Sequence, residues 1–321
     1  MLNKLYLKKR DNRPGTLHLQ RITNMPRIVL IFFMTLLSCS PLVAQSPDNI
    51  KFGEVSAKDF TLPGSPVISG NESAVILADI GTTKFIGNEY HSFSYEYKRL
   101  LRIKVIRKQG TDELATLNIR LYGKDERKDE LSDIKAAVYN LENGKVTTSA
   151  IRKEDIFENK LNLFITEKRL ALPSVKDGCI LEYSYTITSR RIGILPSWSF
   201  QFPNFPCLFS KLEVVIPNAI TYLITRSGLD SFNKQEVATV KNNKYVMGDL
   251  TVLSSATKYN WEMKDIPALK DDKFIYSLND YKDRLEFLMA QFYNGSEVKE
   301  LSTSWEQANN DLMADEDFGM A

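Results

Sequence analysis

The stretch CILEYSYTITS, residues 179–189, alternates apolar or aromatic side chains with mostly polar ones. A period of two is typical of a β-strand, because successive side chains of a strand point to opposite faces of its sheet. Pro173 and Gly178 precede the stretch and interrupt any regular structure before it. The sequence therefore predicts a strand here, with one face buried and the other in water.

Similar runs lie on both sides of this stretch. The candidate strands are residues 93–105, 117–121, 134–138, 198–202, 209–216, 220–225, 245–247 and 257–263. Asn143-Gly144 predicts a hairpin turn, because both turn residues must accept a positive φ angle. Residues 281–293 fit a strand or a helix, and we favour the strand. Short, regularly spaced strands predict an all-β chain that folds as a large antiparallel β-sandwich.

The first 45 residues carry the pattern of a leader and signal peptide. An uncharged apolar run, Ile28 to Leu37, follows Arg27 and precedes small residues up to Gln45. The run is too short for a membrane-spanning helix, which needs about 20 apolar residues. Met25 offers an alternative start just before this segment. We therefore expect residues 1–45 to direct export and then to be processed.

Two forms of processing fit the leader. Ala44 and Gln45 offer ordinary cleavage after small residues, whereas the run LLSC, residues 36–39, resembles a bacterial lipobox that would place a lipid on Cys39. We favour cleavage, because a leucine directly before the small residue matches a lipobox poorly. Both alternatives predict export to the periplasm or cell envelope, the second as a lipoprotein. We expect membrane contact only through the signal segment or a lipid on Cys39.

The charge distribution argues against nucleic acid as a partner. Seven of the 42 basic side chains but one of the 40 acidic ones lie in the first 45 residues, so the rest of the chain is slightly acidic. Such a chain offers no net attraction to a polyanion. The mixed-charge run of residues 124–130 is expected in an exposed loop. Phosphate-binding glycine motifs and metal-site spacings of cysteine and histidine do not occur, so we expect no cofactor and no metal.

Few residues are available for cysteine-dependent catalysis. Beyond the leader, the chain has one histidine, His91, and two cysteines, Cys179 and Cys207. A catalytic thiol needs an imidazole beside it, and nothing in the sequence brings His91 to either cysteine. We expect Cys179 to be buried in a strand and Cys207 to lie in a loop, and whether they form a disulfide stays open. We assign no catalytic residue.

Three runs together carry a family resemblance. LPSVKDGCILEYSYTITS (172–189), LPSWSFQFPNFP (195–206) and LEVVIPNAITY (212–222) resemble the domain of unknown function 3857, and residues 95–106, 259–272 and 303–319 agree with it. The resemblance implies an exported bacterial β-sandwich module, residues 46–300, that precedes a transglutaminase-like domain. Residues 301–321 would begin a helical link, in which Thr303 and Glu306 give a capping-box pattern. The transglutaminase-like domain, with its Cys, His and Asp, is expected to be absent here.

Three hypotheses for function follow. The first is a non-catalytic accessory module that positions the transglutaminase-like domain or its substrate. The second is a stand-alone module that binds an envelope glycan or peptide through exposed aromatic side chains, with Tyr90, Tyr122 and Trp198 as candidates. The third is one half of a split transglutaminase-like cysteine peptidase. We favour the first, and therefore expect no enzymatic activity from this chain alone.

Overall fold

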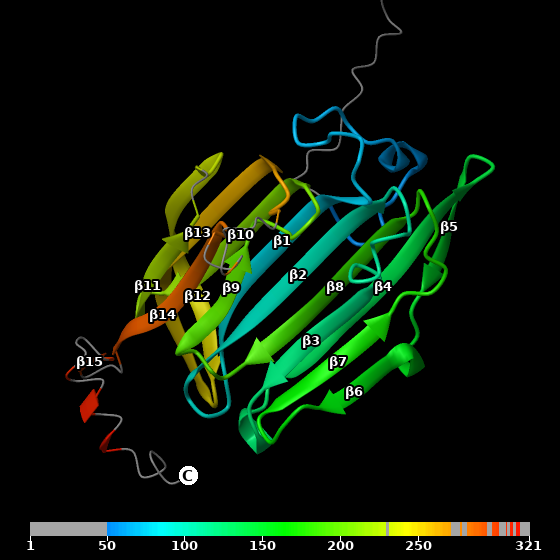
Figure 1. Ribbon diagram of the computed structural model, residues 1–321. Coiled ribbons are helices and arrows are strands. Elements are labelled where there is room, and N and C mark those ends of the chain that lie inside the picture. Colours follow the sequence, from blue (N-terminus) through cyan, green and yellow to red (C-terminus); the bar gives the residue numbers. More distant parts are fainter. Residues whose placement is uncertain are drawn as a thin grey trace, which may run out of the picture. The chain divides into compact units, whose positions relative to one another are not determined.

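The computed structural model describes residues 50–228, 231–270, 277, 281–293 and 297–301, together with Glu306, Asn309, Asn310, Met313 and Ala314 (Figure 1). The chain divides into two units, Met1–Ser46 and Pro47–Ala321, and the described residues belong to the second. The predicted signal peptide, Cys39 and most of the predicted C-terminal helix lie outside the described residues.

Strands dominate the described residues, which confirms the all-β prediction. The strands are β1 (Ala74–Gly87), β2 (Phe93–Val105), β3 (Thr116–Tyr122), β4 (Glu130–Glu142), β5 (Lys145–Ala150), β6 (Ile156–Lys160), β7 (Ile165–Ala171), β8 (Ile180–Ser189), β9 (Ile194–Ser199), β10 (Cys207–Pro217), β11 (Ile220–Ser227), β12 (Lys234–Met247), β13 (Leu250–Ile266), β14 (Arg284–Tyr293) and β15 (Val298–Glu300). Short 3-10 turns are η3 (Ala57–Phe60), η4 (Asp125–Arg127) and η5 (Lys153–Asp155). β14 confirms the strand favoured over residues 281–293.

The largest sheet has eight strands in the order β12-β13-β10-β1-β2-β8-β4-β5. Neighbouring strands are antiparallel except β1 and β10, which run parallel with Ile76 opposite Cys207. Strands on one side of this pair come from residues 74–189, and those on the other side come from residues 207–266. The sheet therefore consists of two halves, each from its own part of the sequence, that meet at one parallel seam.

Two smaller sheets supply the other layer of the sandwich. One contains β3, β7 and β6, and the other contains β11, β14, β15 and β9. Leu170 and Ile119 from the first, and Leu285 and Phe287 from the second, join side chains of the large sheet in one apolar cluster. Burial of these side chains is the main favourable contribution to folding. The shared core confirms the predicted β-sandwich.

Trp198 of β9 fills the core above the large sheet. Its ring lies against Gly81 of β1, where an added Cβ atom would overlap the ring carbons, so this close approach requires glycine. The indole N–H donates to Ser210 Oγ at 3.1 Å. The Arg99 guanidinium lies 5.1 Å from the ring centre and donates to the two carboxylate oxygens of Asp79 at 2.8 and 2.7 Å. A hydrogen-bonded ion pair thus lies beside this buried indole ring in the core.

The opposite face of the large sheet is partly covered, although the sequence predicted that it would lie in water. Residues 51–60, which we call the N-terminal strap, pass over it. Phe52 and Phe60 of the strap pack against a small buried cluster that contains Tyr139 and Ile180. The alternating polar residues of β2 and β8 were assigned correctly to one face. The prediction that this face is wet is correct at Glu96 and Lys98 but wrong at Arg102 and Lys104, where the strap covers the sheet.

A buried ion pair fixes the strap to the sheet. Arg102 donates to Glu182 Oε1 through Nε at 2.7 Å and lies 2.6 Å from it through Nη2. The same guanidinium donates to the carbonyl oxygens of Lys51 and Glu54 at 3.1 and 3.0 Å. Glu182 accepts the backbone N–H of Gly53 at 2.9 Å. All of these hydrogen bonds join residues that are far apart in sequence. Those made by Lys51, Gly53 and Glu54 link the strap to the sheet.

Three local predictions can be compared directly with the structure. Asn143 and Gly144 both have positive φ angles, 51° and 76°, and join β4 to β5 as predicted. Cys207 does not lie in a loop but begins β10, because it pairs with β1 at the seam. The predicted strand over residues 198–202 is wrong beyond Ser199, where the chain leaves the ladder although Phe200 stays buried.

Candidate functional site

A cleft lined by arginine and tyrosine side chains lies where β3 and β8 end. Arg191, just after β8, donates to Asp129 through Nη2 at 3.0 Å and through Nε at 3.3 Å. Its guanidinium lies 4.8 Å from the ring centre of Tyr122, the last residue of β3. Asp129 also accepts the backbone N–H of Tyr122 at 2.9 Å. These contacts hold the Arg191 guanidinium in one orientation beside an exposed aromatic ring.

Asp129 departs from the sequence prediction. The mixed-charge run of residues 124–130 was expected to lie in water, and Lys124, Asp125, Glu126 and Arg127 are exposed. Asp129, however, is 4% exposed, because Arg191 compensates its charge inside the protein. A carboxylate that is buried and paired in this way holds its neighbours in place. Its place in a run of mixed charges gives no sign that it is buried.

The cleft beside Arg191 has a volume of about 360 Å³. Its floor is apolar and its rim carries polar groups, which is the usual composition of a ligand site. Burial raises the pKa of Tyr95, a lining residue whose hydroxyl is hydrogen-bonded to the side chain of Ser189. The lining residues are Tyr95, Tyr97, Arg120, Tyr122, Asp129, Ile187, Arg191, Ile194, Leu195, Pro196 and Ser197.

A second cleft, of about 300 Å³, adjoins the first and shares Arg191 with it. Arg190 lines this second cleft, and its guanidinium lies 3.5 Å from the ring centre of Tyr90. Arg190 Nη1 also donates to the carbonyl oxygen of Glu126 at 2.9 Å. The other lining residues are Asn88, Ser92, Phe93 and Arg127. We call the two clefts together the arginine–tyrosine site.

The arginine–tyrosine site is suited to an extended molecule that carries a negative charge. Asp129 neutralises Arg191, whereas Arg127 and Arg190 have no carboxylate partner in the part of the chain that the structure describes. Guanidinium groups bind carboxylates and phosphates through paired hydrogen bonds. Tyrosine rings add apolar contact surface together with a polar hydroxyl. Because Arg191 is common to both clefts, one ligand is able to contact both.

The three aromatic residues named from the sequence differ in their exposure. Tyr90 and Tyr122 are 46% and 38% exposed and stand beside Arg190 and Arg191 in the arginine–tyrosine site. Trp198 was a candidate only under the second hypothesis, and at 1% exposed it is a core residue that a ligand does not reach. Its ring fills the space over a glycine instead. Sequence reasoning missed the arginines, whose only local signal is the Arg190-Arg191 pair directly after the clearest strand.

The described histidine lies far from both cysteines. Cys207 sits opposite Ile76 near the start of β1, and Cys179 accepts the backbone N–H of Val105 at the end of β2. His91 lies in the turn that joins the other ends of these two strands, about 36 Å away at the rise of an extended chain. Its Nε2 is bonded instead to Asp249 Oδ1 at 2.9 Å. His91 therefore forms no catalytic pair with Cys179 or Cys207.

The two described cysteines are free and buried, which answers the question that the sequence left open. They lie on β10 and next to β8, which are three strand spacings, about 14 Å, apart in the sheet. A disulfide requires Cα atoms within about 7 Å of each other. Cys179 is buried as predicted, and the structure excludes a bond between Cys179 and Cys207.

We expect neither thiol to react while residues 47–321 are folded. Burial raises the pKa of Cys179 and Cys207, so the thiolate is rare as well as inaccessible. An Ellman titration should detect almost no thiol in native buffer and two thiols per chain in denaturant. The variant Thr148→Cys places a control thiol on an exposed strand position. A native reaction of the parent chain as fast as that of the control would contradict this result.

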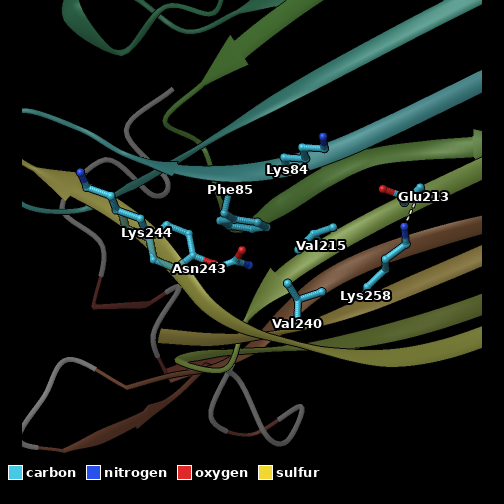
Figure 2. A pocket seen from close by; sticks show the side chains of 9 residues that line it. Lys84, Phe85, Glu213, Val215, Val240, Asn243, Lys244 and Lys258 are labelled. Carbon is cyan, nitrogen blue, oxygen red and sulfur yellow. Dashed lines mark hydrogen bonds and ion pairs between the residues drawn. The ribbon is translucent and has the colours of Figure 1, made fainter. Parts of the chain in front are cut away.

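Another hollow, of about 300 Å³, lies between β1, β10, β12 and β13 (Figure 2). Three lysines stand at its rim, of which Lys258 is held by Glu213 at 2.5 Å. Figure 2 shows the ammonium groups of Lys84 and Lys244 pointing away from Phe85. Since these polar groups do not converge on one point, the arginine–tyrosine site is the stronger candidate.

Across the described ranges, His, Cys, Asp and Glu side chains form no group of three or more that is able to hold a metal ion. The described part of the chain also contains no helix with the length and apolar character needed to cross a bilayer.

The fold defines an all-β sandwich protein with an arginine-rich cleft at one end of its strands. The family model described as "Domain of Unknown Function with solved-structure structure (DUF3857)" matches residues 91–270. The chain belongs to this family, and the resemblance found in the sequence is confirmed. The match contains every strand of the large sheet except β1, and nearly all of the residues that line the arginine–tyrosine site.

Comparison with solved structures finds several distant likenesses, whereas no curated protein matches the chain. A candidate protease from Parabacteroides distasonis is 12% identical with a TM-score of 0.47, over 68% of this chain and 41% of that one. A candidate nutrient-binding protein from Legionella pneumophila is 8% identical with a TM-score of 0.27, over 70% and 69%. An M1 zinc metallopeptidase from Deinococcus radiodurans is 10% identical with a TM-score of 0.25, over 81% and 55%. The chain thus spans less than half of the first of these structures.

Proposed function

We propose that the chain is an exported, non-catalytic module that holds a carboxylate-bearing peptide or glycan of the cell envelope in the arginine–tyrosine site. In this proposal the module presents its ligand to a transglutaminase-like domain, the arrangement that the family resemblance implies. Export is part of the proposal and rests on the apolar segment Ile28 to Leu37 and the small residues that follow it.

One observation carries the proposal: two adjoining clefts share Arg191 and are bordered by exposed tyrosines. A long ligand is able to lie across both clefts, with its negative group near Arg127 and Arg190, which lack a carboxylate partner among the described residues. Its apolar parts would contact the floor formed by side chains such as Ile187 and Leu195. The rigid Arg191–Asp129 pair keeps the boundary between the clefts fixed without reacting itself.

We expect Arg190→Ala to weaken ligand binding at least about tenfold, because it removes charge-assisted hydrogen bonds. The probes are a fluorescently labelled hexapeptide with a free C-terminal carboxylate, its amidated twin, and an acidic oligosaccharide. Fluorescence anisotropy with residues 47–321 measures the affinity for each probe. Binding of the free peptide but not of the oligosaccharide would assign the peptide as ligand, and the reverse would assign the glycan.

Arg152→Ala is the matched control for this experiment. Arg152 is an exposed arginine that pairs with Glu154 and Asp155 and does not line either cleft. We expect this control to bind every probe as the parent chain does. Binding of the free and amidated peptides with equal, measurable affinity would refute the proposed carboxylate site, as would unchanged binding of the preferred probe by Arg190→Ala.

A further inference from the structure

The turn between β6 and β7 presents three large apolar side chains to water. Leu161, Leu163 and Phe164 are 45%, 65% and 58% exposed, and they stand within four consecutive residues. Single exposed apolar residues are ordinary, but a contiguous group on a soluble domain marks a surface that contacts something apolar. We call these three residues the hydrophobic tip.

The backbone of this turn is largely satisfied within the protein. The N–H groups of Leu161 and Asn162 donate to the carbonyl oxygen of Ile165 at 2.9 and 3.3 Å. Phe164 N–H donates to Asn162 Oδ1 at 2.8 Å, and its carbonyl oxygen accepts Gly123 N–H at 2.9 Å. A polar backbone group costs free energy in hydrocarbon only when it lacks a partner. The hydrophobic tip is therefore able to leave water with little loss of backbone hydrogen bonding.

Positive charge lies next to the hydrophobic tip. Lys168 pairs with Glu158 at 2.5 Å, and Lys128 and Lys160 lie near the same carboxylate. The hydrogen bond from Lys168, together with the charges of the three lysines, lowers the pKa of Glu158. Lys168 is bonded to this carboxylate, and Lys128 and Lys160 act on it through their charges; we call the three lysines the lysine collar. Its excess positive charge would attract an anionic surface, and its long side chains are able to reach the polar layer of a bilayer while the tip enters it.

We propose that the hydrophobic tip and the lysine collar dock this module on an anionic lipid bilayer. The apolar side chains would enter the boundary between headgroups and acyl chains, and the lysines would contact the phosphates. A stable protein interface buries about 800 Å² on each partner, far more than three side chains at one turn provide. The small apolar tip with an adjacent cationic collar therefore fits a lipid surface better than a protein partner.

This inference goes beyond the proposed function and uses different residues. The two surfaces are nevertheless neighbours, because Tyr122 of the arginine–tyrosine site pairs with Ile165 directly after the hydrophobic tip. Docking through the tip would hold the clefts close to the bilayer surface. Ligand binding and bilayer binding are separable, since Arg190 is not part of the tip or collar.

Vesicle flotation tests the inference on residues 47–321, which form a unit separate from the apolar leader. The vesicles contain phosphatidylcholine alone or phosphatidylcholine mixed with phosphatidylglycerol. We expect binding to the mixed vesicles, weaker binding at high salt, and a loss of at least about tenfold for the double variant Leu163→Ser/Phe164→Ser. Phe157→Ser is the matched control, because Phe157 is 65% exposed on β6 but lies outside the turn.

The possible results separate a bilayer from other partners. Flotation of the parent and the Phe157→Ser control, without flotation of the tip variant, supports docking through the hydrophobic tip. Unchanged flotation of the tip variant would overturn the inference, as would failure of the parent chain to bind mixed vesicles. Loss of binding to another protein in the tip variant, without any vesicle binding by the parent, would assign the surface to a protein partner and also overturn it. A thermal melt confirms that each variant is folded.

Discussion

Glu182→Ala is expected to lower the free energy of unfolding by about 3–5 kcal/mol. The change leaves the Arg102 guanidinium, whose side chain is 3% exposed, without its counter-charge. It also removes the acceptor for Gly53 N–H, so the N-terminal strap loses one of its bonds to the sheet. Breaking one member of a buried pair costs far more than the net contribution of the intact pair, because the remaining charge is uncompensated.

Urea unfolding followed by tryptophan fluorescence measures this loss. Glu96→Ala is the matched control, because Glu96 is an exposed carboxylate on β2, and we expect its effect to stay within about 0.5 kcal/mol. The double variant Arg102→Met/Glu182→Leu removes both charges and should recover much of the lost stability. A loss below about 1 kcal/mol for Glu182→Ala would show that water reaches Arg102 in solution.

Trp198→Ala should cost about 3–5 kcal/mol of folding free energy, the usual cost of emptying a large aromatic site in a core. The loss has two parts. A cavity forms above Gly81, and Ser210 loses its indole donor while Arg99 loses the aromatic face beside it. Urea unfolding followed by circular dichroism is the measurement, because the variant also lacks a fluorescent side chain. Tyr90→Ala, at an exposed aromatic residue, should change stability by about 0.5 kcal/mol or less.

Gly81→Ala tests the same contact from the other side. In the parent chain the added methyl group overlaps the Trp198 ring, so the sheet or the indole must shift. In the Trp198→Ala background the methyl group has room, and the same change should cost much less. The two effects are therefore expected not to add, as holds for residues in direct contact. Simple additivity of the two losses would contradict the packing described for this core.

Strands with strict alternation could be predicted from the sequence, and the exceptions have physical causes. β8 was recognisable because its core face carries large side chains at every second position. β1 was missed, because Asp79 and Gly81 interrupt its apolar pattern. Both residues serve the packing of Trp198, one through Arg99 and the other by leaving space for the ring. An interruption of this kind can be interpreted only when β9, the strand whose Trp198 packs on β1, is known.

The arginine–tyrosine site could be predicted only in fragments. Tyr90 and Tyr122 were named as exposed aromatic residues, but their arginine partners lie 100 and 69 positions away in the chain. The register of β2 against β8 and of β3 against β7 brings these segments to one end of the strands. The local sequence does not predict how these strands are paired. The N-terminal strap was missed for the same reason, since it covers strands from which it is distant in sequence.

The parallel seam between β1 and β10 has a consequence for how the chain folds while it is being made. Residues 74–189 are synthesised first and contain every strand on one side of the seam. Until residues 207–217 emerge, β1 has no partner on its β10 side and exposes a row of unpaired backbone groups. A half-made chain with such an open edge is prone to join another chain like itself. Safe maturation thus depends on how soon the second half follows the first, or on a chaperone that shields β1 in the interval.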